Sequence, residues 1–277
     1  MANTGLAVAQ EGSAESGLQT TSRVDWLTNQ FLLDIRAPLP ADARNYPAAS
    51  YGAQESVEAD LPQILQQQAS AIRIDSYRTL GEYYGSMPNL AVDVARLSRQ
   101  LRPTVNRQTR DLRYLQLEYA LDLYPALASL FVEHTRARPL PRIISWRPSR
   151  EFTGLVIYAK GSLPVHGEDR VARVSPVMFP DIFDSQMGVV MEPNRVDPQV
   201  LIERGAVAYA TSTDDPVVRR RAGDLPLRTV AVGVFGRYSS DPIIPREDAE
   251  VLFARPANHE LIRDGRIVII IEDSVLD

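Results

Sequence analysis

Four short apolar runs stand out in the second half of the chain. They occupy residues 155–159, 206–210, 229–235 and 266–271, and the first of them is rich in β-branched and aromatic residues and has a glycine on either side. Runs of this length and composition are typical of buried strands. We expect the four runs to pair into one sheet that forms the floor of a C-terminal domain. Short helices are predicted at 198–204, 246–253 and 259–263, with Asn258 as a cap, and 211–224 is predicted to be a polar loop.

The first half of the chain mixes the two periodicities. Residues 115–123 alternate, which places Leu115, Leu117 and Tyr119 on one face and polar residues on the other. This pattern predicts an antiparallel strand with one wet face. Apolar residues three and four positions apart over 43–72 predict a long helix, in which Pro62 favours a kink or a break. Further strands are predicted at 26–35 and 72–77, and further helices at 80–84, 90–100 and 126–133.

These elements predict an α+β protein with two domains. An N-terminal α+β domain, 24–136, combines an antiparallel sheet with the long helix. A proline-rich linker at 137–142 leads to a C-terminal domain, 143–277, with a mixed β-sheet and short helices. Residues 1–23 are small and polar, so we expect a flexible tail. The apolar residues 6–9 leave open whether this tail is the remnant of an export signal peptide or a plain disordered segment.

Composition narrows the possible functions only a little. The 277 residues include 44% hydrophobic and 23% charged residues, as in ordinary globular proteins. A net charge of −5 does not favour binding to nucleic acid or to an anionic membrane. The absence of cysteine excludes disulfides, thiolate metal sites and cysteine nucleophiles. No run reaches the roughly 18 apolar residues of a transmembrane helix.

The basic residues are almost all arginine, with Lys160 as the single lysine. This bias fits a GC-rich genome, and its functional alternative is an arginine-rich contact surface. The candidate for such a surface is the run Arg219, Arg220 and Arg221, which could grip an acidic protein or a phosphate. Nearby aspartates favour a solvated loop instead.

The residues with catalytic potential are scattered. His134, His166 and His259 are far apart and lack zinc-ligand spacing. His166 with Glu168 and Asp169 forms the one local cluster with acid–base potential, and the surrounding glycine and proline favour an exposed turn. No nucleophile elbow, P-loop or dinucleotide-binding glycine motif occurs. We therefore expect no catalytic residue, no cofactor and no metal.

Two further features have both a functional and a structural interpretation. Lys160 follows a predicted buried strand, where it could form a Schiff base or bind phosphate, or simply be solvated. The pairs Asp181/Asp184 and Asp214/Asp215 could hold a divalent cation. They lack the ligand spacing of a calcium loop, which favours turn formation.

Several segments resemble, in order, those of FlgP-like, lipoprotein-related flagellar envelope proteins of the spirochaete type. They are FTGLVIYAKG at 152–161, SPVMFPDIFD at 175–184, AGDLPLRTVAVG at 222–233, DPIIP at 241–245 and RIVIIIED at 266–273. The resemblance spans about residues 24–273. It has two departures, because the chain lacks a lipobox cysteine and has Tyr158 where the family has an aspartate.

The resemblance implies a non-enzymatic structural protein of a periplasmic, flagellum-associated assembly. It would self-associate into a ring or higher oligomer and contact other flagellar or envelope proteins. The family has no catalytic residues to transfer. An alternative is a small-ligand-binding protein or enzyme that uses the 160–184 region with Lys160 and His166. A third possibility is an adaptor close to peptidoglycan or to the outer membrane.

Overall fold

A computed structural model of the protein describes residues 17–40, 45–140 and 147–276. Its contacts separate two compact units. Unit 1 comprises Met1–Ile72 and Leu80–Leu127, and unit 2 comprises Arg73–Thr79 and Ala128–Asp277. The short segment Arg73–Thr79 therefore packs with a unit that otherwise begins only at Ala128. Most of the predicted tail and the end of the predicted linker lie outside the described residues.

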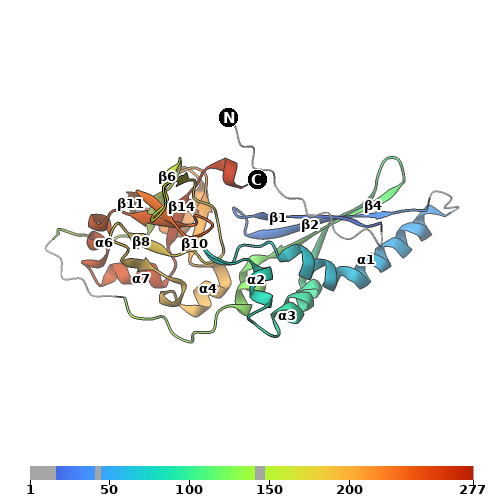
Figure 1. Ribbon diagram of the computed structural model, residues 1–277, viewed down its shortest axis with the longest axis horizontal. Coiled ribbons are helices and arrows are strands. Elements are labelled where there is room, and N and C mark those ends of the chain that lie inside the picture. Colours follow the sequence, from blue (N-terminus) through green and yellow to red (C-terminus); the bar gives the residue numbers. More distant parts are fainter. Residues whose placement is uncertain (1–16, 41–44, 141–146, 277) are drawn as a thin grey trace. The chain divides into compact units, whose positions relative to one another are not determined.

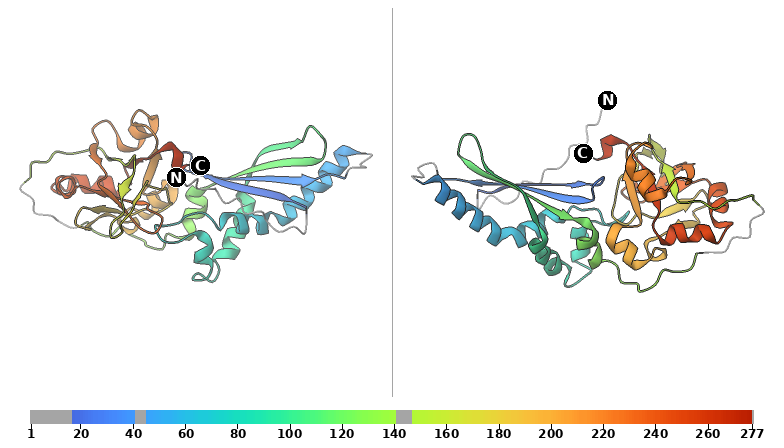
Figure 2. Two further views of the ribbon diagram at one scale, coloured as in Figure 1. Left: turned by 45° about the horizontal axis from the view of Figure 1, so that its top comes forward. Right: turned by 180° about the vertical axis from the view of Figure 1, so that it is seen from behind.

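Unit 1 is an antiparallel sheet with helices on one face. The strand order is β1-β2-β4-β3, with β1 Gln19–Asp25, β2 Gln30–Pro38, β3 Arg102–Gln108 and β4 Tyr114–Asp122. Helices α1 Tyr46–Ala69, α2 Leu80–Tyr84 and α3 Leu90–Arg96 lie on the same side of this sheet (Figures 1 and 2), and α3 continues as the 3-10 turn η1 Leu97–Gln100. Leu115, Leu117 and Tyr119 are buried, as the alternation predicted.

The long helix forms for identifiable local reasons. The Asn45 side chain accepts a hydrogen bond from the Ala48 amide at 3.2 Å, and a proline occupies the first turn. The helix then presents Val57, Leu61 and Leu65 to the core. It runs through Pro62 as one helix, so the predicted break there is wrong.

Several predictions for unit 1 need correction. The strand predicted at 26–35 is β2, and Trp26 lies in the turn before it. Strand β1 falls largely in the predicted tail. It was missed because its side chains are polar, and Gln68 of α1 binds it by hydrogen bonds to Thr20 (2.9 Å) and Ser22 (3.1 Å). Strand β3 was not predicted. The predicted strand at 72–77 contributes only the isolated bridge between Arg73 and Thr79.

The helix predicted at 126–133 is also wrong. The chain forms two short turns there, η2 Leu123–Leu127 and η3 Ala128–Leu130, and is irregular from residue 131. Leu127 and Ala128 are buried, so the apolar stripe is real. The stripe is too short to specify a regular helix.

The main sheet of unit 2 is parallel, and three of its four strands are buried on both faces along nearly their whole length. Its order is β10-β14-β5-β11, with β5 Leu155–Tyr158, β10 Val207–Ala210, β11 Leu227–Val230 and β14 Ile267–Ile270. The predicted pairing of the four runs is thus confirmed, with one correction. The run 229–235 is split between β11 and β12 Gly233–Phe235, which belongs to another sheet.

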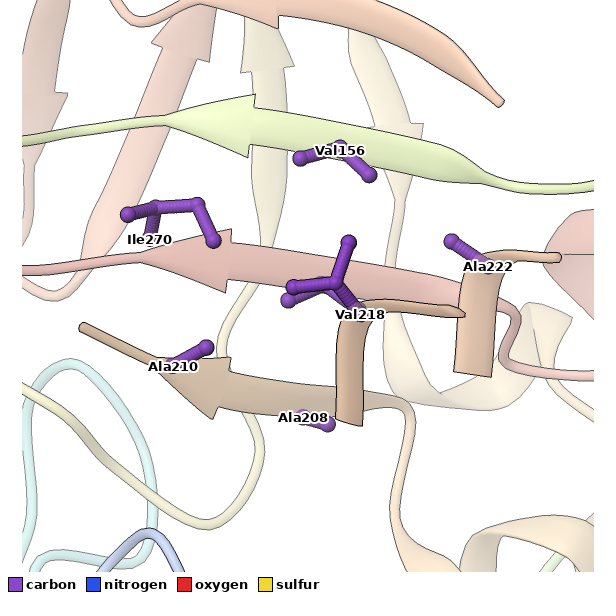
Figure 3. Close-up of a cluster of buried hydrophobic side chains, with 7 residues drawn as sticks. Val156, Ala208, Ala210, Val218, Ala222 and Ile270 are labelled. Atoms are coloured by element: carbon purple, nitrogen blue, oxygen red, sulfur yellow. The ribbon is translucent and has the colours of Figure 1, made fainter. Parts of the chain in front are cut away.

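Helix α5 Pro216–Ala222 covers one face of this parallel sheet. Figure 3 shows Val218 and Ala222 of the helix facing Val156, Ala208 and Ile270 of the strands. The expected polar loop at 211–224 is therefore wrong, because the pattern of two buried residues among arginines was too short to identify. Asp215 begins the helix by accepting a hydrogen bond from the Val217 amide at 2.8 Å.

The family-like stretch at 152–161 has a structural role where it meets this helix. A Cβ at Gly154 would lie 2.4 Å from the Cα of Ala222, so only glycine fits without a shift. The Thr153 hydroxyl donates to the Ala222 carbonyl at 2.7 Å and accepts from the Leu225 amide at 3.0 Å. Thr153 therefore binds the end of α5 and the loop that leads to β11 by hydrogen bonds, and Gly154 packs closely against the end of α5.

A second sheet of unit 2 carries the short strands that sequence did not resolve. Its order is β12-β13-β8-β9, with β8 Ile182–Asp184, β9 Val189–Met191 and β13 Asp241–Ile244. The hairpin of β6 Leu163–Pro164 and β7 Val171–Ala172 lies beside β12. The remaining elements are α4 Pro198–Arg204, α6 Arg246–Phe253, α7 Ala257–Arg263, η4 Pro193–Arg195 and η5 Asp273–Val275.

The helices predicted at 198–204 and 246–253 are confirmed. Asn258 does not act as the predicted cap, because it lies inside α7 and is fully buried. Its side chain bonds to the Phe152 amide and the Arg150 carbonyl, at 2.9 and 3.0 Å. Within the described ranges, no helix has the length and apolarity needed to cross a membrane.

Candidate functional site

The three arginines of the predicted contact surface face different environments on α5. Arg221 is buried, and its guanidinium donates to the Gly205 carbonyl. Arg219 is exposed and pairs with Asp224 at 2.6 Å. Arg220 is exposed. The three side chains therefore do not form one continuous basic surface.

The histidines and Lys160 do not converge. His134 Nε2 lies 3.0 Å from the Val196 carbonyl, and His259 Nε2 lies 3.4 Å from the Phe253 carbonyl. Lys160 is half-buried after β5, where the next amide, Gly161, donates to Glu272. His166 is exposed and contacts Phe235 edge to face, with ring centroids 6.0 Å apart. Among the described residues, no three histidine or acidic side chains are grouped as ligands of a metal ion.

The aspartate pairs separate into two kinds. Asp184 is buried and closes a turn by accepting from the amides of Gln186 and Gly188, both at 2.8 Å. Asp215 caps α5. For these two residues the turn-forming interpretation holds. Asp181 is different, because its carboxylate makes no hydrogen bond or salt bridge to any residue that the structure describes.

Asp181 lies beside a second acid that sequence reasoning did not select, Asp241 at the start of β13. The Asp181 amide donates to Asp241 Oδ1 at 3.0 Å, and the Ser240 hydroxyl donates to the same oxygen at 3.2 Å. Asp241 is only 1% exposed, and its Oδ2 has no hydrogen-bond partner in the described structure. A buried carboxylate oxygen without a partner is costly and needs a reason. We name Asp181 and Asp241 together the acid pair.

The protein environment favours the protonated form of the acid pair. Burial, together with the negative charges of Asp241, Glu192 and Asp75, raises the pKa of Asp181 to about 7. Burial likewise raises the pKa of Asp241 to about 6, although hydrogen bonds from Ser76, Asp181 and Ser240 oppose the shift. Both carboxyl groups of the pair therefore have pKa values closer to neutral pH than an ordinary aspartate.

Nearby basic groups are engaged with other acids. The positive charge of Arg195 lowers the pKa of Asp181, but this effect is the smallest of those that act on the carboxyl. Its guanidinium binds Glu192 at 3.0 Å and the Val189 carbonyl at 2.8 Å. Arg78 is 4.0 Å from Asp75. Neither arginine forms a salt bridge with the acid pair.

Aromatic rings gather around Phe235, on the strand next to Asp241. Phe235 contacts Phe183 and Tyr77 edge to face, with centroids 5.4 and 6.1 Å apart, in addition to His166. Phe235 is the β12 residue directly opposite Asp241 in the antiparallel pair, so both side chains lie on one face of the sheet. We name these four rings the aromatic cluster.

The segment Arg73–Thr79 closes this region. The Ser76 carbonyl accepts from the Tyr238 amide at 3.1 Å, and a Cβ on Gly236 would lie 2.5 Å from the Ser76 Cβ. Tyr77 is 49% exposed, whereas Ser76 is buried. Sequence could not reveal this site, because its residues lie at 75–77, 166, 181–183 and 235–241. Only the presence of Asp181 and His166 in one candidate region pointed toward it.

Two other surfaces have distinctive character. On unit 1, a groove of about 330 Å³ crosses all four strands and is lined by residues including Thr21, Arg23, Asp34, Thr104 and Glu118. On unit 2, apolar side chains are exposed at the end of the edge strand β11, just after it, and at the end of the neighbouring strand β5. Val230 is 59% exposed, Val232 45%, and Tyr158, which pairs with Val230 across the sheet, 43%. We name Tyr158, Val230 and Val232 the β11 edge patch.

Comparison with protein families gives two matches that follow each other along the chain. Residues 17–130 match the family described as Treponema pallidum Tp0624, N-terminal domain. Residues 154–273 match the family described as Treponema pallidum Tp0624, second domain. A comparison with curated proteins found no match. The chain is therefore similar to two successive domains of a spirochaete protein, and nothing in these matches confirms the FlgP-like assignment.

Proposed function

We propose that this protein is a non-enzymatic, self-associating component of a periplasmic assembly on the cell envelope. The observation that carries the proposal is the β11 edge patch. Isolated exposed apolar residues are common, but a group of exposed apolar residues next to the edge of a sheet is a typical site of association. Because β11 pairs only with β5 among the described residues, it has a free side in its sheet.

A second copy of the chain is the occupant that this proposal assigns to the patch. Contact between the patch and a different surface of the next copy would be heterologous, which is the geometry that builds rings or filaments. A role in the flagellar apparatus rests on the sequence resemblance alone. Fractionation of cells and imaging of motors with and without the gene would test that part separately.

The association is tested by light scattering coupled to size-exclusion chromatography at tens of micromolar protein. We expect the native protein to elute above the mass of a monomer. The double variant Val230→Lys/Val232→Lys should shift it to a monomer, because a charge at each position opposes burial. Val92→Lys is the matched control, since Val92 is 52% exposed on α3 of unit 1. A native monomer, or an oligomer that survives the double variant, would refute the proposal.

One observation favours the alternative of ligand binding by the 160–184 region. Both His166 and Asp181 belong to that region. His166 contacts the ring of Phe235, and Asp181 contacts Asp241, which lies directly opposite Phe235 in the sheet. This arrangement does not depend on the β11 edge patch.

A further inference from the structure

We propose that the acid pair and the aromatic cluster form a binding site for an arginine side chain presented by a neighbouring protein. The site would take a guanidinium group, with Asp181 as its ionic contact and the rings around Phe235 as its walls. This inference goes beyond self-association and is independent of the β11 edge patch.

The first argument is the register of the second sheet. Phe235 lies opposite Asp241, and Phe183 of β8 lies beside Ile243 of β13. Because side chains alternate along a strand, Asp241 and Ile243 point to the same face, and so do Phe183 and Phe235. The ring contact of 5.4 Å between Phe183 and Phe235 confirms this placement. The acid and the rings therefore occupy one face.

The second argument is the uncompensated negative charge. Asp241 Oδ2 is buried without a partner, and the Asp181 carboxylate has no salt bridge in the described structure. Arg195 is already held by Glu192. Native proteins rarely leave buried acids in this state unless the site binds something. A cation placed against Asp181 would supply the missing charge.

The third argument selects the chemistry of the cation. A divalent metal needs several oxygen or nitrogen ligands, and the described residues do not group three such side chains. A guanidinium group is planar, stacks on aromatic faces and pairs with a carboxylate through two parallel hydrogen bonds. Tyr77, His166 and the half-buried Phe183 offer ring surface at the rim.

The fourth argument concerns the different roles of the two acids in binding. Asp181 is partly exposed and can reach a group from outside, whereas Asp241 is buried behind it. The contact from the Asp181 amide to Asp241 fixes the position of Asp181. Asp241 is therefore a positioning residue that also adds negative potential, and Asp181 is the group that touches the ligand.

The test uses the full chain and two blocked amino acids of equal charge, N-acetylarginine methylamide and N-acetyllysine methylamide. Binding is followed at pH 8 and constant ionic strength by NMR of the aromatic side chains. We expect saturable shifts of the Phe183, Phe235 and Tyr77 rings. The arginine probe should bind several-fold more tightly than the lysine probe, because only the guanidinium can stack and pair at once.

Asp181→Asn should weaken binding of the arginine probe by about tenfold or more, since a charge-assisted hydrogen bond is lost. Tyr77→Ala should weaken it less. Asp214→Asn removes an exposed charge from another loop and should have no effect, which controls for net charge. Circular dichroism checks that each variant is folded.

Three results would overturn the inference. They are the absence of saturable ring shifts, equal binding of the two probes, and equal binding by the protein with Asp181→Asn. The Val230→Lys/Val232→Lys variant should bind the arginine probe normally. Loss of self-association and loss of arginine binding are therefore distinguished by separate variants.

Discussion

Asp122 of unit 1 and Asp241 of unit 2 both lie at the end of a strand, but their surroundings are opposite. Asp122 accepts two hydrogen bonds from Arg102, at 2.6 and 2.7 Å, and one from Gln30 at 3.0 Å. The Arg102 contacts lower the pKa of Asp122. Burial raises the pKa of Asp241 instead, and one of its oxygens has no partner.

The same contrast extends over each sheet. On the wet face of unit 1, the Gln116 amide donates to Asp34 of the neighbouring strand β2 at 3.1 Å and to Glu118 of its own strand at 3.0 Å, so these polar groups are paired within the sheet. In unit 2, the central strands of the parallel sheet are covered on both faces, and the acid pair beside the second sheet forms no salt bridge in the described structure. Asp122 and Asp34 of unit 1 are thus paired with neighbouring side chains. Unit 2 instead keeps a buried acid without a basic partner, which costs stability and is typical of a functional site.

Truncating consecutive strand residues should separate the two sheets most strongly. Ile269 and Ile270 of β14 lie on opposite faces and are both 0% exposed. Ile269→Ala and Ile270→Ala should each lower the free energy of unfolding of unit 2 by about 2–5 kcal/mol. In unit 1, Ile35→Ala should cost as much, whereas its exposed neighbour Arg36→Ala should stay within about 0.5 kcal/mol.

The measurement is urea unfolding with hydrogen exchange resolved by residue, so that each unit reports separately. If either isoleucine can be truncated as cheaply as Arg36, the parallel sheet is not buried on both faces. The two sheets would then not differ in burial, and the contrast between the units would be wrong.

Replacing the acids by amides should have opposite effects in the two units. At pH 8, Asp241→Asn should stabilise unit 2 by about 1–3 kcal/mol, because it removes a charge from a site where burial favours the neutral form. The amide oxygen can still accept from the Asp181 amide. Asp122→Asn should destabilise unit 1 by less than about 1 kcal/mol, since it breaks an exposed ion pair.

The sign depends on pH in a way that can be checked. The pKa of Asp241 is raised in the folded state, so the folded protein holds a proton that the unfolded chain releases above pH 4. The carboxyl therefore lowers stability progressively as pH rises from 3.8 to about 6, and the loss levels off above that pH. The gain from Asp241→Asn should shrink at pH 5, where the native acid is largely protonated. A destabilised Asp241→Asn at pH 8 would contradict the assignment of an uncompensated charge.

Local patterns in the sequence predicted the parts of the fold that depend on burial. The apolar runs of β5, β10 and β14 and the alternation of β4 identified their strands correctly, because each side chain faces a single environment. Strand β1 was not predicted because most of its side chains are polar. Those of Thr20 and Ser22 pack on α1 through hydrogen bonds to Gln68, which leave no apolar pattern in the sequence. Helix α5 escaped because arginines surround its two main buried residues, Val218 and Ala222.

The site was beyond reach for a different reason. Its residues come from four separated segments, and Asp241 stood in the run 241–245, which was noted for its resemblance to a family segment and not as a candidate site. The family-like residues that were most visible, Thr153 and Gly154, hold the end of α5 rather than a ligand. Sequence patterns report local burial, whereas the acid pair arises from packing between distant segments.

The most direct test of the uncompensated acid pair is a pH titration of the aspartate side-chain carboxyl carbons by ¹³C NMR. The signals are assigned with Asp181→Asn and Asp241→Asn. We expect midpoints near 7 for Asp181 and near 6 for Asp241, while Asp122 titrates below its ordinary value of 3.8. Midpoints for both members of the pair at or below 3.8 would mean that their charges are compensated in solution, and the account would be wrong.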